Sequence, residues 1–302
     1  MEIKREQYLN ELIERKNNGL IKVITGLRRS GKSYLLNKLY RSYLLNHGIK
    51  ASQIISFAFD NLENIMILDK YLPDEQTLIY DTRKNYVVNP KKFILYINDL
   101  TKENDVYYFL LDEIQLLGDF VFALNGLLSH DNYDIYVTGS NSKMLSKDVI
   151  TEFRGRGDQI HIYPLSFKEY YDSVNLSFED AYLEYQYYGG MPYLLSIDDE
   201  KRKQEYLKDL FSEIYIKDIT ERNGIKNIDS FETLLNILSS SIGSYTNPGK
   251  LEKTFKSVEK VVYDHDTIKK HIDCIKDAYL ISEAKRYDIK RKKYIGSNSK
   301  YY

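Results

Sequence analysis

A short glycine-containing segment near the start of the chain constrains its fold more than any other feature. Residues 26–33 read GLRRSGKS, between the apolar run LIKVIT and the stretch KSYLLNKLYRSYLLNH, whose apolar residues recur at helical spacing. Glycines at this spacing allow a tight turn whose backbone N–H groups point inward, and a helix beginning there adds partial positive charge. A strand, such a turn and a helix in this order predict a phosphate-binding loop.

The residue types in this loop suit the phosphates of a nucleotide and a Mg²⁺ ion. Lys32 is expected to reach the β- and γ-phosphates, and the Ser33 hydroxyl is expected to ligate Mg²⁺. A chance glycine turn is the alternative, and the flanking strand and helix count against it. The predicted binding residues are Gly26, Leu27, Arg28, Arg29, Ser30, Gly31, Lys32 and Ser33.

A second motif, YYFLLDEIQ, ends an apolar run in two carboxylates. The run predicts a buried strand, so Asp112 and Glu113 would lie where the carboxyl end of a parallel strand opens into a site. Asp112 is predicted to hold Mg²⁺, directly or through water, and Glu113 to polarise an attacking water. An ordinary acidic strand end is the alternative. A second carboxylate here is typical of a hydrolysing ATPase, whereas a kinase does not need one.

Two polar motifs accompany the later strands. VTGSNS ends one predicted strand, and Ser140 or Asn141 there could hydrogen-bond the water or the γ-phosphate. A capped turn is the alternative, since these residue types are common in turns. FRGRGDQ leads into another strand, and Arg156 or Arg154 could reach the γ-phosphate of a neighbouring subunit. Exposed arginines are usually only solvated, so the choice stays open between either arginine and neither.

Strands and helices alternate through the first half of the chain. Buried strands are predicted at 20–25, 53–59, 106–115, 134–140 and 159–165. Their continuous apolar runs suit strands that are covered on both faces. Helices are predicted at 4–18, 32–47, 91–102, 166–188, 199–222, 229–242, 248–258 and 266–278, before a hairpin at the end. This order predicts an α/β fold, a P-loop NTPase core with a mainly parallel five-stranded sheet flanked by helices.

Composition restricts the remaining classes of function. The 302 residues are 43% hydrophobic and 29% charged, a globular composition and not a disordered one. No apolar stretch reaches the roughly 18 residues that a membrane span requires, so no membrane partner is expected. The N-terminus lacks the apolar segment of a secretory signal. One cysteine, Cys274, excludes an internal disulfide and a cysteine-rich zinc site, and it fits a reducing cytoplasm.

Charge is spread unevenly along the chain. The net charge is −1, yet residues 250–302 carry 14 Lys and Arg against 8 Asp and Glu. A basic tail on an acidic body indicates a polyanionic partner, and a solvated charged face is the alternative.

The motifs GLRRSGKS, LLDEIQ, TGSNS, the FRGRG…IYPLSFKEY segment and YYGGMPY, in this order, resemble a family of prokaryotic AAA-type ATPases. The resemblance covers essentially the whole chain. It implies a P-loop core, a C-terminal domain containing a winged helix, the cofactors ATP and Mg²⁺, and a cytoplasmic setting. Members often carry a nuclease-like portion and usually continue past the hairpin that ends here in KYY. The chain is therefore expected to lack the rest of that domain.

With this resemblance, the predicted domains are a P-loop AAA-type core (1–165), a helical lid (166–225) and an incomplete winged-helix-like C-terminal domain (226–302). The predicted function is Mg²⁺-dependent ATP hydrolysis coupled to movement of the C-terminal domain. The residues implied in catalysis are Lys32, Glu113, Ser140 and Arg156, and those implied in metal binding are Ser33 and Asp112. A third class, a small-molecule kinase, is disfavoured by Glu113 and by the long helical C-terminal half.

The alternative function is a nucleotide-switched DNA-binding regulator with little turnover. In that version the helix at 266–278 is the recognition helix, and a basic wing contacts DNA phosphates. Winged helices also dock proteins, so protein partners or self-association are further possibilities. The predicted wing residues, within 285–293, are Lys285, Arg286, Lys290, Arg291, Lys292 and Lys293.

Overall fold

The computed structural model describes residues 3–81, 85–102, 105–139, 153, 155–259, 263–288 and 293–302. Its chain forms two compact units, residues 1–197 and 198–302. The division into a core, a lid and a C-terminal domain stays a prediction, because compactness does not assign roles.

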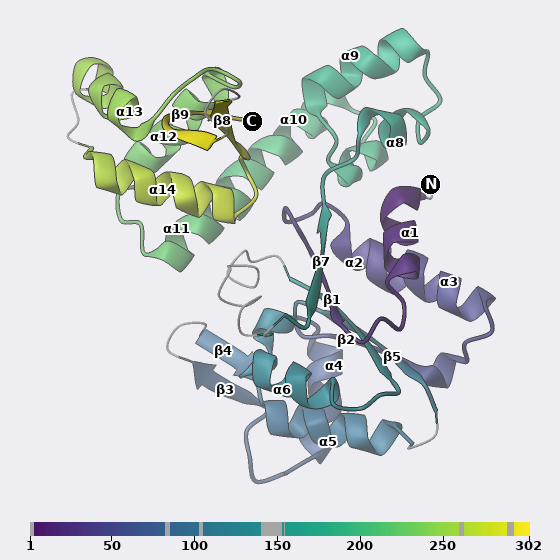
Figure 1. Cartoon of the computed structure of the whole chain (residues 1–302). Coiled ribbons are helices and arrows are strands. Elements are labelled where there is room, and N and C mark those ends of the chain that lie inside the picture. The colour runs from purple at the N-terminus through teal and green to yellow at the C-terminus, as the bar shows by residue number, and fades with distance from the viewer. Residues whose placement is uncertain are drawn as a thin grey trace. The chain divides into compact units, whose positions relative to one another are not determined.

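A five-stranded parallel sheet forms the centre of the first unit (Figure 1). Across the sheet the strands are β2 (Ile54–Ala58), β5 (Tyr107–Asp112), β6 (Tyr133–Thr138), β1 (Ile21–Gly26) and β7 (Gly157–Ile162). Every neighbouring pair is parallel, so the carboxyl ends of all these strands open at one edge of the sheet. The predicted α/β class and the parallel five-stranded sheet are confirmed.

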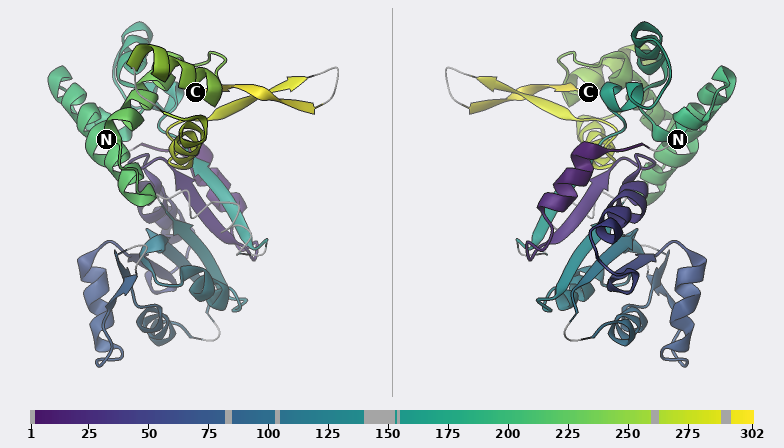
Figure 2. Two further views of the ribbon diagram at one scale, coloured as in Figure 1. Left: turned by 90° about the vertical axis from the view of Figure 1, so that its left-hand side faces the viewer. Right: turned by 90° about the vertical axis from the view of Figure 1, so that its right-hand side faces the viewer.

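Helices cover both faces of this sheet, which explains the continuous apolar runs of its strands (Figures 1 and 2). Along β5, Tyr108 and Leu110 pack into one core, whereas Phe109 and Leu111 pack into the other. The first core is covered by α1 (Glu6–Glu14) and by one continuous helical segment made of α2 (Lys32–Tyr34), η1 (Leu35–Tyr40) and α3 (Arg41–Asn46). The second core is covered by α5 (Pro90–Leu100) and α6 (Phe120–Leu127).

The first unit also differs from the prediction at particular places. The segment predicted as one helix at 166–188 forms two, α8 (Phe167–Tyr171) and α9 (Phe178–Tyr188), because Ser177 accepts a hydrogen bond from the Asp180 N–H and caps a second helix. A short hairpin and two short helices, one of them α6, were not predicted, because their runs are too brief for a periodic pattern. The remaining elements are η2 (Ala51–Gln53), α4 (Leu62–Ile67), η3 (Leu68–Lys70), β3 (Leu78–Asp81), β4 (Asn85–Val88), η4 (Ile114–Leu116) and η6 (Pro192–Ser196).

The second unit is helical and ends in an antiparallel hairpin. Its elements are α10 (Glu200–Asp209), η7 (Leu210–Ile216), α11 (Lys217–Asn223), α12 (Ile228–Ser240), α13 (Pro248–Thr254), η8 (Phe255–Glu259), α14 (His265–Asp277), β8 (Glu283–Asp288) and β9 (Lys293–Tyr301). Phe231, Phe255 and Ile268 lie in its buried core. Figure 2 shows the hairpin extending beyond the helices of its own unit. The predicted helices and hairpin agree with the structure, and the winged-helix assignment stays a prediction.

Within the described ranges, no helix combines the length and the apolarity needed to cross a membrane.

Candidate functional site

The glycine-containing loop turns between β1 and α2. Gly26 has a φ of +137° and Gly31 a φ of +96°, both in the region that favours glycine. Space also requires glycine at the first position, because a Cβ added to Gly26 would lie 2.0 Å from the carbonyl oxygen of Ile162. Ile162 is its direct partner on β7. The loop therefore begins where two strand backbones lie too close for any other residue.

Lys32 folds back inside this loop. The side chain is only 5% exposed, and its Nζ donates to the carbonyl oxygens of Gly26 and Leu27, each at 3.0 Å. Burial lowers the pKa of the Lys32 ammonium, and the carboxylates of Glu113 and Asp112 act in the opposite direction. The ammonium is thus held within the turn and interacts with the acidic end of β5.

The acidic residues are oriented by a hydroxyl on the neighbouring strand. Thr138, the last residue of β6, donates to Asp112 Oδ1, and its Oγ1 accepts from the Glu113 N–H at 3.1 Å. Gln115 Nε2 donates to the Glu113 carboxylate. Glu113 itself has a φ of +53°, an uncommon conformation for a residue with a side chain. Thr138 therefore couples the two carboxylate residues, and the left-handed backbone turns the chain off the strand at Glu113.

Asp112 lies beside the start of α2. Burial raises the pKa of the Asp112 carboxyl, and hydrogen bonds with Thr138 and Ser33 act against that rise. Asn37 Nδ2 lies 3.4 Å from Asp112 Oδ2. Ser33 is exposed, so the structure places an accessible hydroxyl next to a carboxylate. These are oxygen ligands of the kind that Mg²⁺ takes, and the residues present fit that ion.

Thr25 and His161 lie beside the loop and were missed in the sequence. Thr25 Oγ1 lies 3.1 Å from His161 Nδ1 and accepts from Gln159 Nε2 at 3.3 Å. Burial lowers the pKa of His161, and the charge of Lys32 acts in the same direction. Thr25 and His161 are direct partners in the register of β1 and β7, although 136 positions separate them. Only the pairing of these strands shows that they meet. Thr138, by contrast, belongs to the motif VTGSNS. In that motif Ser140 and Asn141 were the predicted site residues, and Thr138 was not.

The other predicted residues lie in the loop, before β7 or outside the described part of the chain. Arg28 and Arg29 are exposed, and Ser30 is fully buried. Arg156 is exposed and precedes β7, where its carbonyl oxygen accepts from the Ile21 N–H at 2.8 Å. Ile21 begins β1, so Arg156 lies at the edge of the sheet opposite the loop and does not join the site of its own chain. Ser140, Asn141 and Arg154 lie outside the described residues.

A glycine loop at the carboxyl edge of a five-stranded parallel sheet, with a lysine and two carboxylate residues beside it, defines a P-loop protein. The chain belongs to the AAA domain family, whose model matches residues 18–171. A second family model, described as a domain of unknown function, matches residues 179–302. The predicted resemblance is thereby confirmed for the core.

Two relatives match nearly the whole chain. An uncharacterized protein of Haemophilus influenzae is 36% identical over 305 residues, which cover 99% of this chain and 71% of the relative. The uncharacterized protein MJ1544 of Methanocaldococcus jannaschii is 28% identical over 288 residues, which cover 90% of this chain and 58% of the relative. Both relatives are therefore longer than the part that this chain spans.

Among solved structures, the Aeropyrum pernix ORC2 protein in its ADPNP–ADP complexes has a TM-score of 0.48 and 13% identity, covering 94% of this chain and 88% of its own. AMPPCP-bound DnaA from Aquifex aeolicus has a TM-score of 0.40 and 15% identity, covering 89% and 86%. Both TM-scores are below 0.5, so neither structure indicates a function for this chain.

Proposed function

We propose that this chain binds ATP and hydrolyses it with the help of Mg²⁺ at the edge of the sheet formed by the loop and the ends of β5 and β6. The observation that carries the proposal is that Lys32 lies close to Asp112 and Glu113 and that Ser33 is hydrogen-bonded to Asp112. Thr138 is hydrogen-bonded to both acidic residues. A phosphate loop alone would support binding, and the pair of carboxylates adds the groups that hydrolysis requires.

Each group has a separate task in this proposal. The N–H groups of residues 26–33 surround the β-phosphate, and Lys32 contributes its charge to the β- and γ-phosphates. Ser33 and Asp112 hold Mg²⁺, which when bound neutralises charge on the phosphate oxygens. Glu113 orients the attacking water and accepts its proton, while Gln115 holds the carboxylate in place.

Two further predicted residues also have proposed roles. Ser140 is proposed to contact the water or the γ-phosphate. Arg156 is proposed to act on the site of a neighbouring subunit, because it is exposed and lies at the opposite edge of the sheet from its own loop. Self-association is therefore part of the proposal, and a cytoplasmic setting is supported by the single free, buried cysteine, Cys274.

Changing Lys32 to Ala is expected to weaken ATP binding by roughly 10- to 100-fold, the usual worth of a charge-assisted hydrogen bond. Isothermal titration calorimetry on the folded variant measures the change. The matched control is Lys102→Ala, which removes an exposed lysine before β5, at the edge of the sheet opposite the loop, and should leave the affinity unchanged. Unchanged affinity in folded Lys32→Ala would show that this loop does not bind the phosphates.

We also propose that hydrolysis moves a winged-helix-like domain at 226–302 through a lid at 166–225. The order α12, α13, α14 and then the β8–β9 hairpin supports this proposal, since winged helices place a helix and a hairpin against their partner. The alternative function, a nucleotide-switched DNA-binding regulator, is favoured by the exposed basic pair Lys285 and Arg286 on β8. Lys290, Arg291 and Lys292 lie outside the described residues, and Lys293 begins β9.

If the hairpin binds DNA, changing Lys285 and Arg286 to Ala should lower the slope of log K against log salt by up to about 2. Each phosphate contact contributes about 0.9 to that slope. Filter binding of a duplex across a salt series measures it, with Lys201→Ala on α10 as an exposed-lysine control. If the unmodified chain binds no duplex at low salt, the DNA alternative is wrong and a protein-docking role is favoured.

A further inference from the structure

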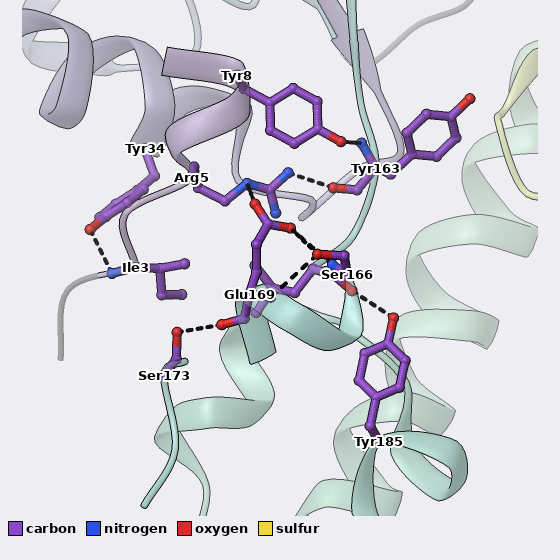
Figure 3. Close-up of polar contacts among 10 residues, drawn as sticks. Ile3, Arg5, Tyr8, Tyr34, Tyr163, Ser166, Glu169, Ser173 and Tyr185 are labelled. Carbon is purple, nitrogen blue, oxygen red and sulfur yellow. Dashed lines mark hydrogen bonds and ion pairs between the residues drawn. The ribbon is translucent and has the colours of Figure 1, made fainter. Parts of the chain in front are cut away.

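An ion pair between a buried arginine and a partly buried glutamate joins the N-terminal segment to α8 in the first unit (Figure 3). Arg5 is 3% exposed, and its Nε lies 3.4 Å from Glu169 Oε1. Its Nη2 donates to the carbonyl oxygen of Tyr163 at 2.6 Å, and its guanidinium carbon lies 4.6 Å from the centroid of the Tyr8 ring. One side chain thus contacts α1, the residue that follows β7, and the first turn of α8.

The burial of the Arg5 guanidinium and the backbone conformation of Arg5 both oppose folding. Burial lowers the pKa of the Arg5 guanidinium, and the Glu169 charge acts in the opposite direction. Arg5 also has a φ of +48°, a left-handed conformation that is unfavourable for residues with a side chain. Buried ion pairs often contribute little net stability, and one attested use is to select a single arrangement over its competitors. The pair is therefore better suited to positioning than to stabilisation.

Glu169 connects this pair to the start of α8. Its Oε2 accepts from the Ser166 N–H at 2.9 Å and from Ser166 Oγ at 3.1 Å, which completes a capping box. Ser166 ends the linker 163–166 between β7 and α8. Arg5 holds that linker at one end through Tyr163 and at the other end through Glu169.

One path of contacts leads from the N-terminal segment to the helix of the loop. The Ile3 N–H donates to the Tyr34 hydroxyl at 3.3 Å, and Figure 3 shows both residues beside Arg5. Tyr34 directly follows Ser33 in the helix that begins at the loop. A shift of residues 3–5 would therefore change a contact one residue from the proposed Mg²⁺ ligand.

A second path leads from the linker to the loop itself. Within the linker, the Leu165 N–H donates to the Gly190 carbonyl oxygen at 2.7 Å. Gly190 is followed by η6, whose Pro192 Cγ would lie 3.9 Å from a Cβ on Gly31. The linker that Arg5 holds thus also positions η6, which lies next to the second glycine of the loop.

We infer that Arg5 and Glu169 are positioning residues of the proposed ATP site, which lock the N-terminal segment to the linker 163–166 and so hold Tyr34 and Pro192 against the loop. Neither residue touches the nucleotide in this role. The role rests on the proposed function, because the property it controls is the affinity for ATP.

The test compares ATP affinity with thermal stability in the full chain. Glu169→Gln keeps an oxygen for the Ser166 capping bonds but removes the charge, and it should weaken ATP binding about tenfold. The matched control is Asp172→Asn, which removes an exposed partner of Lys168 on the turn that follows and should bind ATP as the parent does. Calorimetry with ATP and a melting curve are recorded for each protein.

A double variant, Arg5→Met with Glu169→Gln, separates positioning from stability, because it removes both charges while the amide oxygen keeps the Ser166 capping bonds. Removing both partners of an ion pair together avoids leaving the buried one unpaired, so stability should recover relative to Glu169→Gln alone. A thioether side chain in place of the Arg5 guanidinium offers no donor to the Tyr163 carbonyl oxygen, so the linker loses its anchor. ATP affinity should therefore stay about tenfold weaker although the melting temperature recovers. Recovery of both quantities together, or parental affinity in Glu169→Gln, would overturn the positioning role. Failure of the unmodified chain to bind ATP would instead contradict the proposed function.

Discussion

Replacing Glu113 with Gln is expected to leave ATP bound and to slow its hydrolysis by roughly 10²-fold or more, the usual worth of a positioned general base. An amide of the same shape can still accept from Gln115, but it cannot take the proton of the attacking water. Calorimetry measures the retained affinity, and release of inorganic phosphate without an added acceptor measures turnover. Steady release by the unmodified chain would also exclude the kinase class.

Two further variants separate the proposed role of Glu113 from metal binding and from a general effect of losing a carboxylate. Asp112→Asn should lose the part of ATP binding that depends on Mg²⁺, because Asp112 lies beside the Ser33 hydroxyl. Glu63→Gln makes the same chemical change on the exposed first turn of α4 and should hydrolyse ATP at the parental rate. Equal turnover by Glu113→Gln and the parent would remove Glu113 from the proposed mechanism.

Changing Asp134 to Asn is expected to destabilise the first unit by about 3–5 kcal/mol, the usual cost of removing one partner from a buried ion pair. Lys22 is 0% exposed and forms an ion pair with Asp134, which is itself 3% exposed. Asp134 also accepts from the Asn17 N–H at 3.0 Å and from the Tyr136 hydroxyl at 2.9 Å. Without the carboxylate, a lysine charge is left inside the sheet with no counter-charge from β6.

Urea denaturation followed by the near-ultraviolet circular dichroism of the tyrosines measures this loss, since the chain has 29 Tyr and no Trp. The control is Asp99→Asn, which removes an exposed partner of Lys70 and should not shift the denaturation midpoint. An unchanged midpoint in Asp134→Asn would contradict the predicted contribution of the Lys22–Asp134 ion pair to stability.

Much of the first unit follows from local patterns. Continuous apolar runs predicted each strand of the sheet, and helical spacing of apolar residues predicted most helices. The two-helix form of 166–188 was missed because a cap at Ser177 competes with an apolar pattern that continues across it. The winged-helix interpretation of the second unit came from resemblance alone, and helix order by itself does not establish it.

Part of the candidate site also follows from local sequence patterns. Gly26, Lys32 and Ser33 belong to one short segment, residues 26–33, so their spacing alone predicts a phosphate-binding loop. Asp112 and Glu113 could be found because an apolar run that ends in carboxylates marks the end of a buried strand.

The sequence by itself determined the phosphate loop, the acidic strand end and the alternation of strands and helices, because each depends on residues close together in the chain. Tertiary structure alone decided the contacts of Thr138 with Asp112, of Thr25 with His161 and of Arg5 with Glu169. The order of strands places β6 between β5 and β1, and the register of β7 sets which residue meets Thr25. Strand order and register depend on packing between distant segments, and no local pattern encodes which distant residue becomes a neighbour.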